Sequence, residues 1–420
     1  MTRPLSLAGA GVACMLVSAT AAQDTQVPAP QVISLGHGMY AAVGVMGGRD
    51  VRVPQSNTFL VETAAGNVII DTSGGAGSIA HRRALRAISS APVKAIVLTH
   101  AHGDHTGGVT LWKETGTDIL VQREHDEFVR YLQRLQPFMA RRNAAQFGIP
   151  LAPPTPVPAF EPTVRFDDRY PFTVGDVAFE LLHTPGETPD HLTAWIPAFR
   201  AAFIGDNYYD SFPNLYTLRG TKPRWALEYV ESLNKVLALD AELVLPSHGL
   251  PIRGRDEIRR RLTRYRDAIL FVHDATVKGM NDGIDLSTLM RQIKLPPHLD
   301  IGESYGKLTW SIRGIYEGYA GWFDGNVSTM YGLPSDAYGD IVEMAGGPDA
   351  VARRARQLAE RDPIRALRLT DASLAVDAAH RASLEVRLQA LRALDARSDN
   401  SNERGWLRAD IRAAEARLKP

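Results

Sequence analysis

Residues 99–108 have the sequence THAHGDHTGG and directly follow a short apolar run, AIVL, at residues 95–98. Three histidines and one aspartate this close together cannot all be core residues. Residues 100 and 102 are alternate positions of an extended loop, whereas the side chains of residues 104 and 105 face in other directions. One loop can therefore offer two pairs of metal ligands. Imidazole and carboxylate both suit zinc, and two ions about 3.5–4 Å apart can clamp a substrate oxygen. The stretch predicts a two-metal site that includes His100, His102, Asp104 and His105.

Around this loop, short apolar runs alternate with helical patterns from residue 32 to about residue 244. The predicted helices cover residues 79–88 and, as one long helix, residues 124–147. A proline-rich loop follows at residues 150–162. Strands interleaved with helices indicate a layered α/β domain. The predicted strands are 59–61, 68–70, 95–98, 119–121, 179–182, 192–196, 202–204 and 243–245.

The pattern becomes purely helical at Arg255. Apolar residues then recur at steps of three and four, as on one face of an amphipathic helix, and Asp285 can cap the next helix. Residues 310–323 are rich in aromatics and glycine. We interpret them as helix-packing core; a dimer or substrate surface is the alternative. From residue 348 onward, Ala, Leu and Arg at helical spacing predict two or three antiparallel helices of a tetratricopeptide-like kind.

The bulk composition is that of an ordinary globular protein. Lys plus Arg (47) balances Asp plus Glu (47), which gives no electrostatic reason to expect nucleic acid as a partner. Arg3, the apolar run 5–17 and the small residues 19–22 predict a signal peptide over 1–22. That run is shorter than the ~20 residues of a membrane span, so we expect export, to the periplasm of a double-membrane bacterium. The one cysteine, Cys14, lies inside the signal, and a metal site must therefore use His, Asp and Glu.

The HAHGDH sequence at 100–105 is the His-x-His-x-Asp-His signature of the metallo-β-lactamase superfamily, which the chain resembles. Asp71, which ends the predicted strand 68–70, resembles the acidic residue that supports the metal loop from behind the ligands; a simple turn aspartate is the alternative. The motifs HTPGE at 183–187, IGDN at 204–207 and PSHG at 246–249 follow in the family's order. They supply Glu187, Asp206 and His248.

Glu187 stands where most of the superfamily has histidine, and in this it resembles the alkylsulfatase branch. NLYTLRG at 214–220 and GYAGWFDGN at 318–326 resemble that branch as well. The resemblance implies one zinc held by His100, His102 and Glu187, and a second held by Asp104, His105 and His248, with Asp206 as the bridge. The sequence departs from the branch at the bridging position, where the family usually has Glu and this chain has Asp206. His191 could compete as a metal ligand, but we interpret it as a residue that lies behind the ligands or at the surface.

The same resemblance implies that Arg219 binds the sulfate group, for which a guanidinium fork is suited; a surface ion pair is the alternative. Arg141 and Arg142 lie in a segment that resembles the family's substrate loop, with pairing to carboxylates on a helix as the equal alternative. Asp104 or Asp206 would orient the attacking water. We therefore expect a hydrolase that cleaves sulfate esters, a small-molecule substrate, two Zn²⁺ per chain and a homodimer.

The implied architecture is α/β, an αββα sandwich followed by an all-α region. The expected domains are the signal peptide (1–22), the catalytic domain (23–254), a helical dimerisation domain (255–340) and a C-terminal helical segment (341–420). Hydrolysis of a β-lactam or lactone is the rival within the enzyme class. A non-catalytic metal-binding protein and an iron-dependent redox protein are rivals from other classes, and metal analysis would separate zinc from iron.

Overall fold

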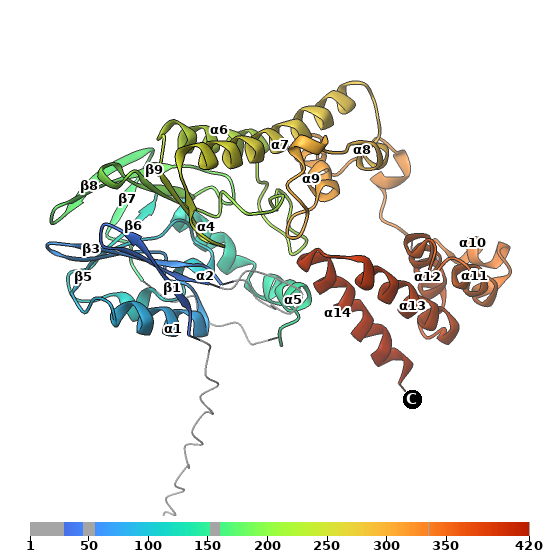
Figure 1. Cartoon of the computed structure of the whole chain (residues 1–420). Coiled ribbons are helices and arrows are strands. Elements are labelled where there is room, and N and C mark those ends of the chain that lie inside the picture. The colour runs from blue at the N-terminus through green and yellow to red at the C-terminus, as the bar shows by residue number, and fades with distance from the viewer. Residues whose placement is uncertain (1–28, 45–54, 152–159, 335, 420) are drawn as a thin grey trace, which may run out of the picture.

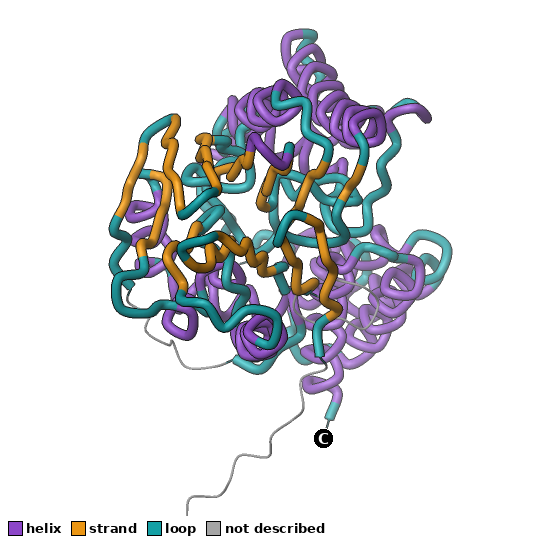
Figure 2. The backbone as a smooth tube through the Cα atoms, turned by 60° about the vertical axis from the view of Figure 1, so that its left-hand side comes forward, coloured by secondary structure: helices purple, strands orange, loops and turns teal. Residues whose placement is uncertain are grey.

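Two β-sheets face each other, and helices cover their outer faces, in the computed structural model of the chain (Figures 1 and 2). The structure describes residues 29–44, 55–151, 160–334 and 336–419. A purely helical region follows the sandwich, so the predicted αββα architecture with an all-α C-terminal region is confirmed. The expected signal peptide lies outside the described residues. Within the described part of the chain, no helix is both long enough and apolar enough to cross a membrane.

The strands of each sheet keep a simple order. The first sheet runs from β1 to β7 and the second from β13 to β8. The first sheet comprises β1 (Gln31–Gly36), β2 (Met39–Val43), β3 (Thr58–Thr63), β4 (Gly66–Ile70), β5 (Val93–Val97), β6 (Asp118–Gln122) and β7 (Val164–Phe166). The second comprises β8 (Arg169–Val174), β9 (Val177–His183), β10 (Leu192–Ile196), β11 (Ala201–Gly205), β12 (Leu243–Pro246) and β13 (Ile252–Arg253). Strands β4 to β7 are parallel, as are β11 and β12.

The main core lies between the two sheets. Its side chains come from alternate residues of both inner faces, as the period of two in a strand requires. Phe59 of β3 and Phe203 of β11 meet edge to face, with ring centroids 5.1 Å apart. Because both sheets are covered on their outer faces too, central strands such as β4, β10 and β11 are buried along their whole length. This explains why they appear in the sequence as continuous apolar runs.

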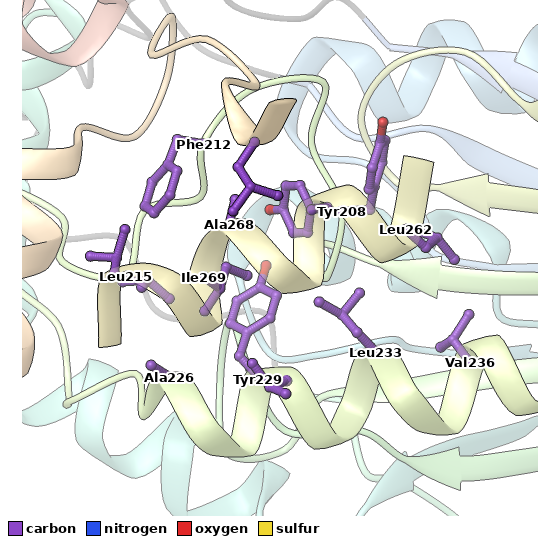
Figure 3. Packing of buried hydrophobic residues seen from close by; sticks show 14 of the residues in the cluster. Tyr208, Phe212, Leu215, Ala226, Tyr229, Leu233, Val236, Leu262, Ala268 and Ile269 are labelled. Carbon is purple, nitrogen blue, oxygen red and sulfur yellow. The ribbon is translucent and has the colours of Figure 1, made fainter. Parts of the chain in front are cut away.

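Helices cover both outer faces of the sandwich. Helices α1 (Gly75–Arg86), α2 (Gly103–Thr106) and α3 (Val109–Trp112) belong to the side of the first sheet, and α6 (Ala226–Ala238) to that of the second. The long helix α7 (Arg255–Asn281) lies over α6, and the two share an apolar seam that includes Tyr229, Leu233, Leu262 and Ile269 (Figure 3). The amphipathic pattern after Arg255 therefore marks the helix that joins the catalytic layer to the helical region.

The predicted single helix over 124–147 is wrong, because the structure divides it into α4 (His125–Arg134) and α5 (Gln136–Phe147). Leu135 separates the two helices with φ near −103° and ψ near 9°. Pro137 explains the break: it has no backbone N–H to donate and its ring clashes with the preceding turn, so it is tolerated only in the first turn of a helix. The residues at 152–159 of the proline-rich loop lie outside the described ones.

The helical region begins with α7 and continues with α8 (Leu286–Gln292), which Asp285 caps by accepting a hydrogen bond from the Thr288 N–H at 3.0 Å, as predicted. Helix α9 (Leu308–Ala320) buries Ile312 and Ile315, but Trp322 and Phe323 beyond its end are exposed. The interpretation of 310–323 as packing core thus holds for the helix and not for its end. A short helix, α10 (Gly339–Met344), comes next. From residue 347 onward the described residues form four helices, more than the two or three predicted: α11 (Gly347–Arg356), α12 (Pro363–Val376), α13 (Arg381–Arg397) and α14 (Ser401–Leu418).

Candidate metal centre

Four chain segments bring the predicted ligands to one edge of the sandwich. Each segment follows the end of a strand: the loop after β5 carries residues 99–105, the loop after β9 carries Glu187, and Asp206 and His248 follow β11 and β12. Strands β5, β11 and β12 point toward this edge with their carboxyl ends, where polar side chains can converge without disturbing the apolar core. The structure places all seven predicted ligands here.

The Asp71 carboxylate lies behind the loop and ties two of these segments together, the loop after β5 and the residues after β12. It accepts hydrogen bonds from the Thr99 backbone N–H at 2.8 Å and from the Ser247 hydroxyl at 2.8 Å, and its Oδ2 lies 2.8 Å from Nδ1 of His105. With Nδ1 of His105 held in this way, Nε2 is left facing the centre. The carboxylate therefore fixes both the orientation and the tautomer of the imidazole.

The first ligand group contains His100, His102 and Asp206, whose ligand atoms all lie within 4.8 Å of one another. Nε2 of His100 is 3.8 Å from Oδ2 of Asp206 and 2.8 Å from Nδ1 of His102. Glu187 adjoins this group, with its Oε1 3.8 Å from Nδ1 of His102. Two imidazoles and two carboxylates thus surround one point, a donor set suited to zinc.

The second ligand group contains Asp104, His105 and His248. Oδ2 of Asp104 lies 3.5 Å from Nε2 of His105 and 3.3 Å from Nε2 of His248. Oδ2 of Asp206 is 3.4 Å from each of the same two nitrogens. The single oxygen Oδ2 of Asp206 therefore lies within reach of both groups, which is the position of a bridging ligand.

Two buried polar atoms indicate that the centre suits cations. Nε2 of His105 and Oδ1 of Asp206 are buried, and neither has a hydrogen-bond partner among the described residues. Buried polar atoms in folded proteins are nearly always paired, so such a pair of orphans is typical of a site that a metal completes. Burial of His248 disfavours its charged form, but the Asp206 and Asp104 carboxylates outweigh this effect and raise the pKa of His248 to about 10. The centre thus carries negative charge that favours positive ions.

A buried arginine orients Glu187. Burial raises the pKa of Glu187 to about 7, against the opposing effect of the Arg224 guanidinium. Nη1 of Arg224 bonds to Oε2 of Glu187 and also donates to the Asn214 carbonyl at 2.8 Å. Since Oε2 is engaged with Arg224, Oε1 remains to face His102. Asn207 fixes the backbone of the same loop by accepting a hydrogen bond from the Glu187 N–H at 3.1 Å.

His191 supports the centre and does not project a free nitrogen into it. Its Nε2 accepts a hydrogen bond from the Asp206 N–H at 3.0 Å, and its Nδ1 lies 3.2 Å from the Thr184 hydroxyl. Gly205 makes this approach possible, because a Cβ at that position would lie 2.3 Å from Nε2 of His191 and its φ of 54° disfavours any side chain. Both ring nitrogens are thus occupied by protein groups.

The Arg219 side chain lies close enough to the centre for its charge to act there. Burial lowers the pKa of His102 well below its usual value, and the charges of Arg219 and Arg224 lower it further. Arg219 also acts on Glu187. Its neighbour in space, Arg142, does not pair with carboxylates on its helix: its Nε donates to the Arg219 carbonyl at 2.7 Å.

Three residues at the centre were missed by the sequence analysis: Arg224, Tyr209 and Tyr305. The Tyr209 hydroxyl donates to Oδ2 of Asp206 at 2.7 Å, and its ring lies 4.9 Å from that of Tyr305. Arg224 follows the NLYTLRG motif by four residues, and Tyr209 follows Asp206 by three. For these two residues the closeness to a recognised motif was the available signal, whereas Tyr305 adjoins no such motif, and aromatic and basic residues in loops have many other uses.

Comparisons with known proteins agree with this geometry. A family model described as the metallo-beta-lactamase superfamily matches residues 51–248, and one described as alkyl sulfatase dimerisation matches residues 286–416. A linear primary-alkylsulfatase from Pseudomonas sp. (strain ATCC 19151) is 31% identical over 393 residues, which cover 86% of this chain and 74% of the relative. The chain belongs to the alkylsulfatase branch of the metallo-beta-lactamase superfamily. The expectation of a hydrolase of this family is thereby confirmed.

Two further relatives are also described as alkylsulfatases. An (R)-specific secondary-alkylsulfatase from Pseudomonas sp. is 26% identical, over 82% of this chain and 58% of that protein. The solved structure of the stereoselective inverting sec-alkylsulfatase Pisa1 from Pseudomonas sp. superposes with a TM-score of 0.80 at 24% identity, over 93% of this chain and 66% of that one. The fold of the alkylsulfatase branch thus extends over nearly the whole chain, which spans between about half and three quarters of the length of these relatives. The second family model, at 286–416, extends across the boundary that the sequence analysis placed at residue 340.

Proposed function

We propose that this protein is a two-zinc hydrolase that cleaves sulfate esters, with alkyl sulfates as its substrates. The observation that carries the proposal is the single oxygen Oδ2 of Asp206, which lies within 3.4–3.8 Å of nitrogens from both ligand groups. His100, His102 and Glu187 would hold one ion and Asp104, His105 and His248 the other, with Asp206 between them. The alkylsulfatase relatives support the choice of substrate, since the chain is 31% and 26% identical to two of them and its helical region matches the alkyl sulfatase dimerisation model.

When bound, zinc supplies a strong Lewis acid and lowers the pKa of water to about 7, so that hydroxide is available at neutral pH. The chain's own residues supply orientation. Asp104 and Asp206 can accept a hydrogen bond from the attacking water, and the Tyr209 hydroxyl restrains Asp206 at 2.7 Å. Arg219 would bind two sulfate oxygens with its guanidinium fork. Water is consumed, and an alcohol and hydrogen sulfate are released.

Sulfate release tests this proposal. Purified protein would be incubated with primary and secondary alkyl sulfates of several chain lengths, zinc-loaded and after chelation. We expect zinc-dependent release that falls by roughly 100-fold or more in Glu187→Gln and in Arg219→Gln, because a ligand and an anion-binding group are lost. The exposed residues Glu228 and Arg259 offer matched controls, Glu228→Gln and Arg259→Gln, which should retain activity.

The opposite outcome is equally clear. If the protein holds two zinc ions per chain and releases sulfate from none of these esters, the sulfatase proposal is wrong. The metal centre would then be tested against β-lactams and lactones, the rival substrates of the superfamily. Metal analysis of the same preparation separates a zinc hydrolase from an iron-dependent redox protein.

We also propose that the protein is an exported homodimer, placed in the periplasm by the signal peptide over 1–22. The match to the alkyl sulfatase dimerisation model supports the dimer. The segment between α9 and α10 supports it too, because it exposes large apolar side chains, including Trp322 at 74% and Leu333 at 72% of their surface. Apolar side chains gathered in this way mark an interaction site more often than free surface.

A further inference from the structure

The C-terminal helix α14 lies against α5 of the catalytic domain (Figure 1). The contact is specific and largely buried. Nε2 of Gln146 on α5 donates to Oδ1 of Asn402 at 2.9 Å, and Nε1 of Trp406 donates to Oε1 of Gln146 at 3.3 Å. At Gly405 the two backbones are so close that a Cβ would lie 1.6 Å from the Gln146 carbonyl oxygen. The glycine therefore allows a backbone contact that defines where α14 docks.

Arg142 connects this docking site to the segment that carries Arg219. It precedes Gln146 by one helical turn on α5, so both side chains lie on the same face. Its guanidinium is 5.1 Å from the ring centroid of Trp406 on α14 and 5.2 Å from that of Phe138 on α5. From this position Nε donates to the Arg219 carbonyl at 2.7 Å, and Nη2 donates to the Leu218 carbonyl. Two aromatic rings thus hold the guanidinium, which in turn holds two consecutive carbonyls.

The N-terminal end of α14 reaches the other side of the centre. Nδ2 of Asn402 donates to the Tyr305 carbonyl at 2.9 Å, and Nδ2 of Asn400 donates to the same carbonyl at 3.0 Å. The Tyr305 ring contacts Tyr209, whose hydroxyl donates to Asp206. Helix α14 is therefore linked to two backbone segments that flank the metal centre, directly to residue 305 and, through Arg142, to residues 218–219.

We infer that α14 is a structural part of the active site, and that Arg142 is a positioning residue for Arg219. The inference rests on the proposed function, in which Arg219 binds the sulfate group. A flexible Arg219 segment would have to become ordered each time a substrate binds, and that ordering would weaken binding. With its carbonyls held by Arg142, the segment presents the Arg219 side chain in place before the substrate arrives.

The test compares two adjacent arginines in the zinc-loaded, full-length protein. Arg142→Gln removes the guanidinium that spans the two carbonyls, whereas Arg141→Gln changes an exposed neighbour that makes no such bond within the described part of the chain. Hydrogen exchange of the amides at 213–220 and binding of inorganic sulfate would be measured for both variants. We expect faster exchange and roughly tenfold weaker sulfate binding in Arg142→Gln only, with a raised KM and a smaller change in kcat.

Two further variants keep the test decisive. Arg142→Lys retains a cation and should restore part of the sulfate affinity, whereas Trp406→Leu removes one of the two rings and should loosen 213–220 from the side of α14. If Arg142→Gln does not fold, these two variants take its place. Unchanged exchange and unchanged sulfate binding in all folded variants would overturn the inference.

Failure of the proposed function gives a different result. In that case the wild-type protein neither binds inorganic sulfate nor releases it from esters. The exchange of 213–220 still reports whether α14 holds this segment, because that measurement needs no substrate. Faster exchange in Arg142→Gln would then support the positioning role, and unchanged exchange would exclude it.

Discussion

At the scale of single residues, Asp71 and Asp206 organise the centre in different ways. Asp71 has a left-handed backbone, with φ of 54°, and its carboxylate is fully engaged by Thr99, His105 and Ser247. Non-glycine residues adopt this conformation at a cost and keep it only where their surroundings enforce it. Asp206 instead keeps one oxygen buried without a partner among the described residues. The first carboxylate holds the ligands in place, and the second is left available to a metal.

Arg224 is expected to stabilise the protein most when the metal is absent. Arg224→Met leaves the Glu187 carboxylate buried without its partner, a change that typically costs about 3–5 kcal/mol. A bound zinc ion would itself compensate Glu187, so the loss should be smaller in the metal-loaded protein. Thermal unfolding with and without a chelator measures this difference, and Arg259→Met, at an exposed site, serves as the control. Equal losses in both states would contradict this role of Arg224.

Zinc uptake by the metal-free protein should release protons. Burial lowers the pKa of His105, but Asp206, Asp104 and Asp71 together raise it well above its usual value, and carboxylates likewise raise that of His248 to about 10. The His248 imidazole therefore carries a proton at pH 8 that a metal must displace, and the raised pKa of His105 favours a second such proton. We expect at least one proton released per chain and an affinity that rises with pH up to about 10, the pKa of His248. Calorimetry in buffers of different ionisation enthalpy counts the protons, and a buffer-independent enthalpy would refute the prediction.

At the scale of secondary-structure elements, the chain uses strand ends for chemistry and helix faces for attachment. Each ligand segment follows a strand, at the point where the backbone leaves the sheet. Helix α5 is separated from α4 at Leu135, and this break allows α5 to turn its own face toward α14. A proline in a long helical pattern thus creates a docking helix in place of a continuous one.

Gly405→Ala distinguishes intrinsic helix propensity from packing. Alanine is favoured over glycine inside a helix by about 1 kcal/mol, which alone would stabilise α14. The added Cβ, however, would overlap the Gln146 carbonyl oxygen and force α14 away from α5, and overpacking of this kind costs about 1–3 kcal/mol. We expect packing to prevail and the free energy of unfolding to fall in a denaturant titration. Gly339→Ala, at an open position in α10, is the matched control and should not destabilise.

At the scale of the whole molecule, the apolar clusters show how the layers are joined. One cluster fills the sandwich, one lies outside the first sheet, one joins the second sheet to α6–α9, and a separate one holds the C-terminal helices together. Helix α14 packs against α13 on one side and against α5 on the other, and so connects the C-terminal helices to the catalytic domain. The segment between α9 and α10 contributes little to any of them and exposes its apolar side chains.

Removing this apolar surface should weaken the proposed dimer. In a Trp322→Ser and Leu333→Ser double variant, two side chains exposed at 74% and 72% lose the apolar area that a partner would cover. Light scattering coupled to size-exclusion chromatography should then show a shift from dimer toward monomer. Ile79→Ser, on α1 of the catalytic domain, removes a comparable exposed side chain and should have no effect. A wild-type protein that is monomeric at all concentrations would exclude the dimer itself.

The amino-acid sequence alone was sufficient for a layered α/β domain, for most of its central strands and for the positions of the ligand motifs, and the resemblance to the metallo-β-lactamase superfamily implied the αββα sandwich. These features are local: an apolar run predicts a buried strand, and closely spaced histidines and aspartates at its end predict a metal loop. Helix ends that depend on a single residue were harder to predict from the sequence. The break before Pro137 is an example, because the spacing of apolar residues is helical on both sides of it.

Only the tertiary structure revealed the partners that lie far apart in the chain. Arg224 meets Glu187 across 37 residues, and Gln146 meets Asn402 across 256. Such contacts depend on how the sheets and helices pack, and a side chain that can pair with many groups carries no local mark of the one it will meet. The roles of Tyr209, Arg224 and α14 were therefore decided by packing, whereas the identity of the metal-binding motif was decided by spacing along the chain.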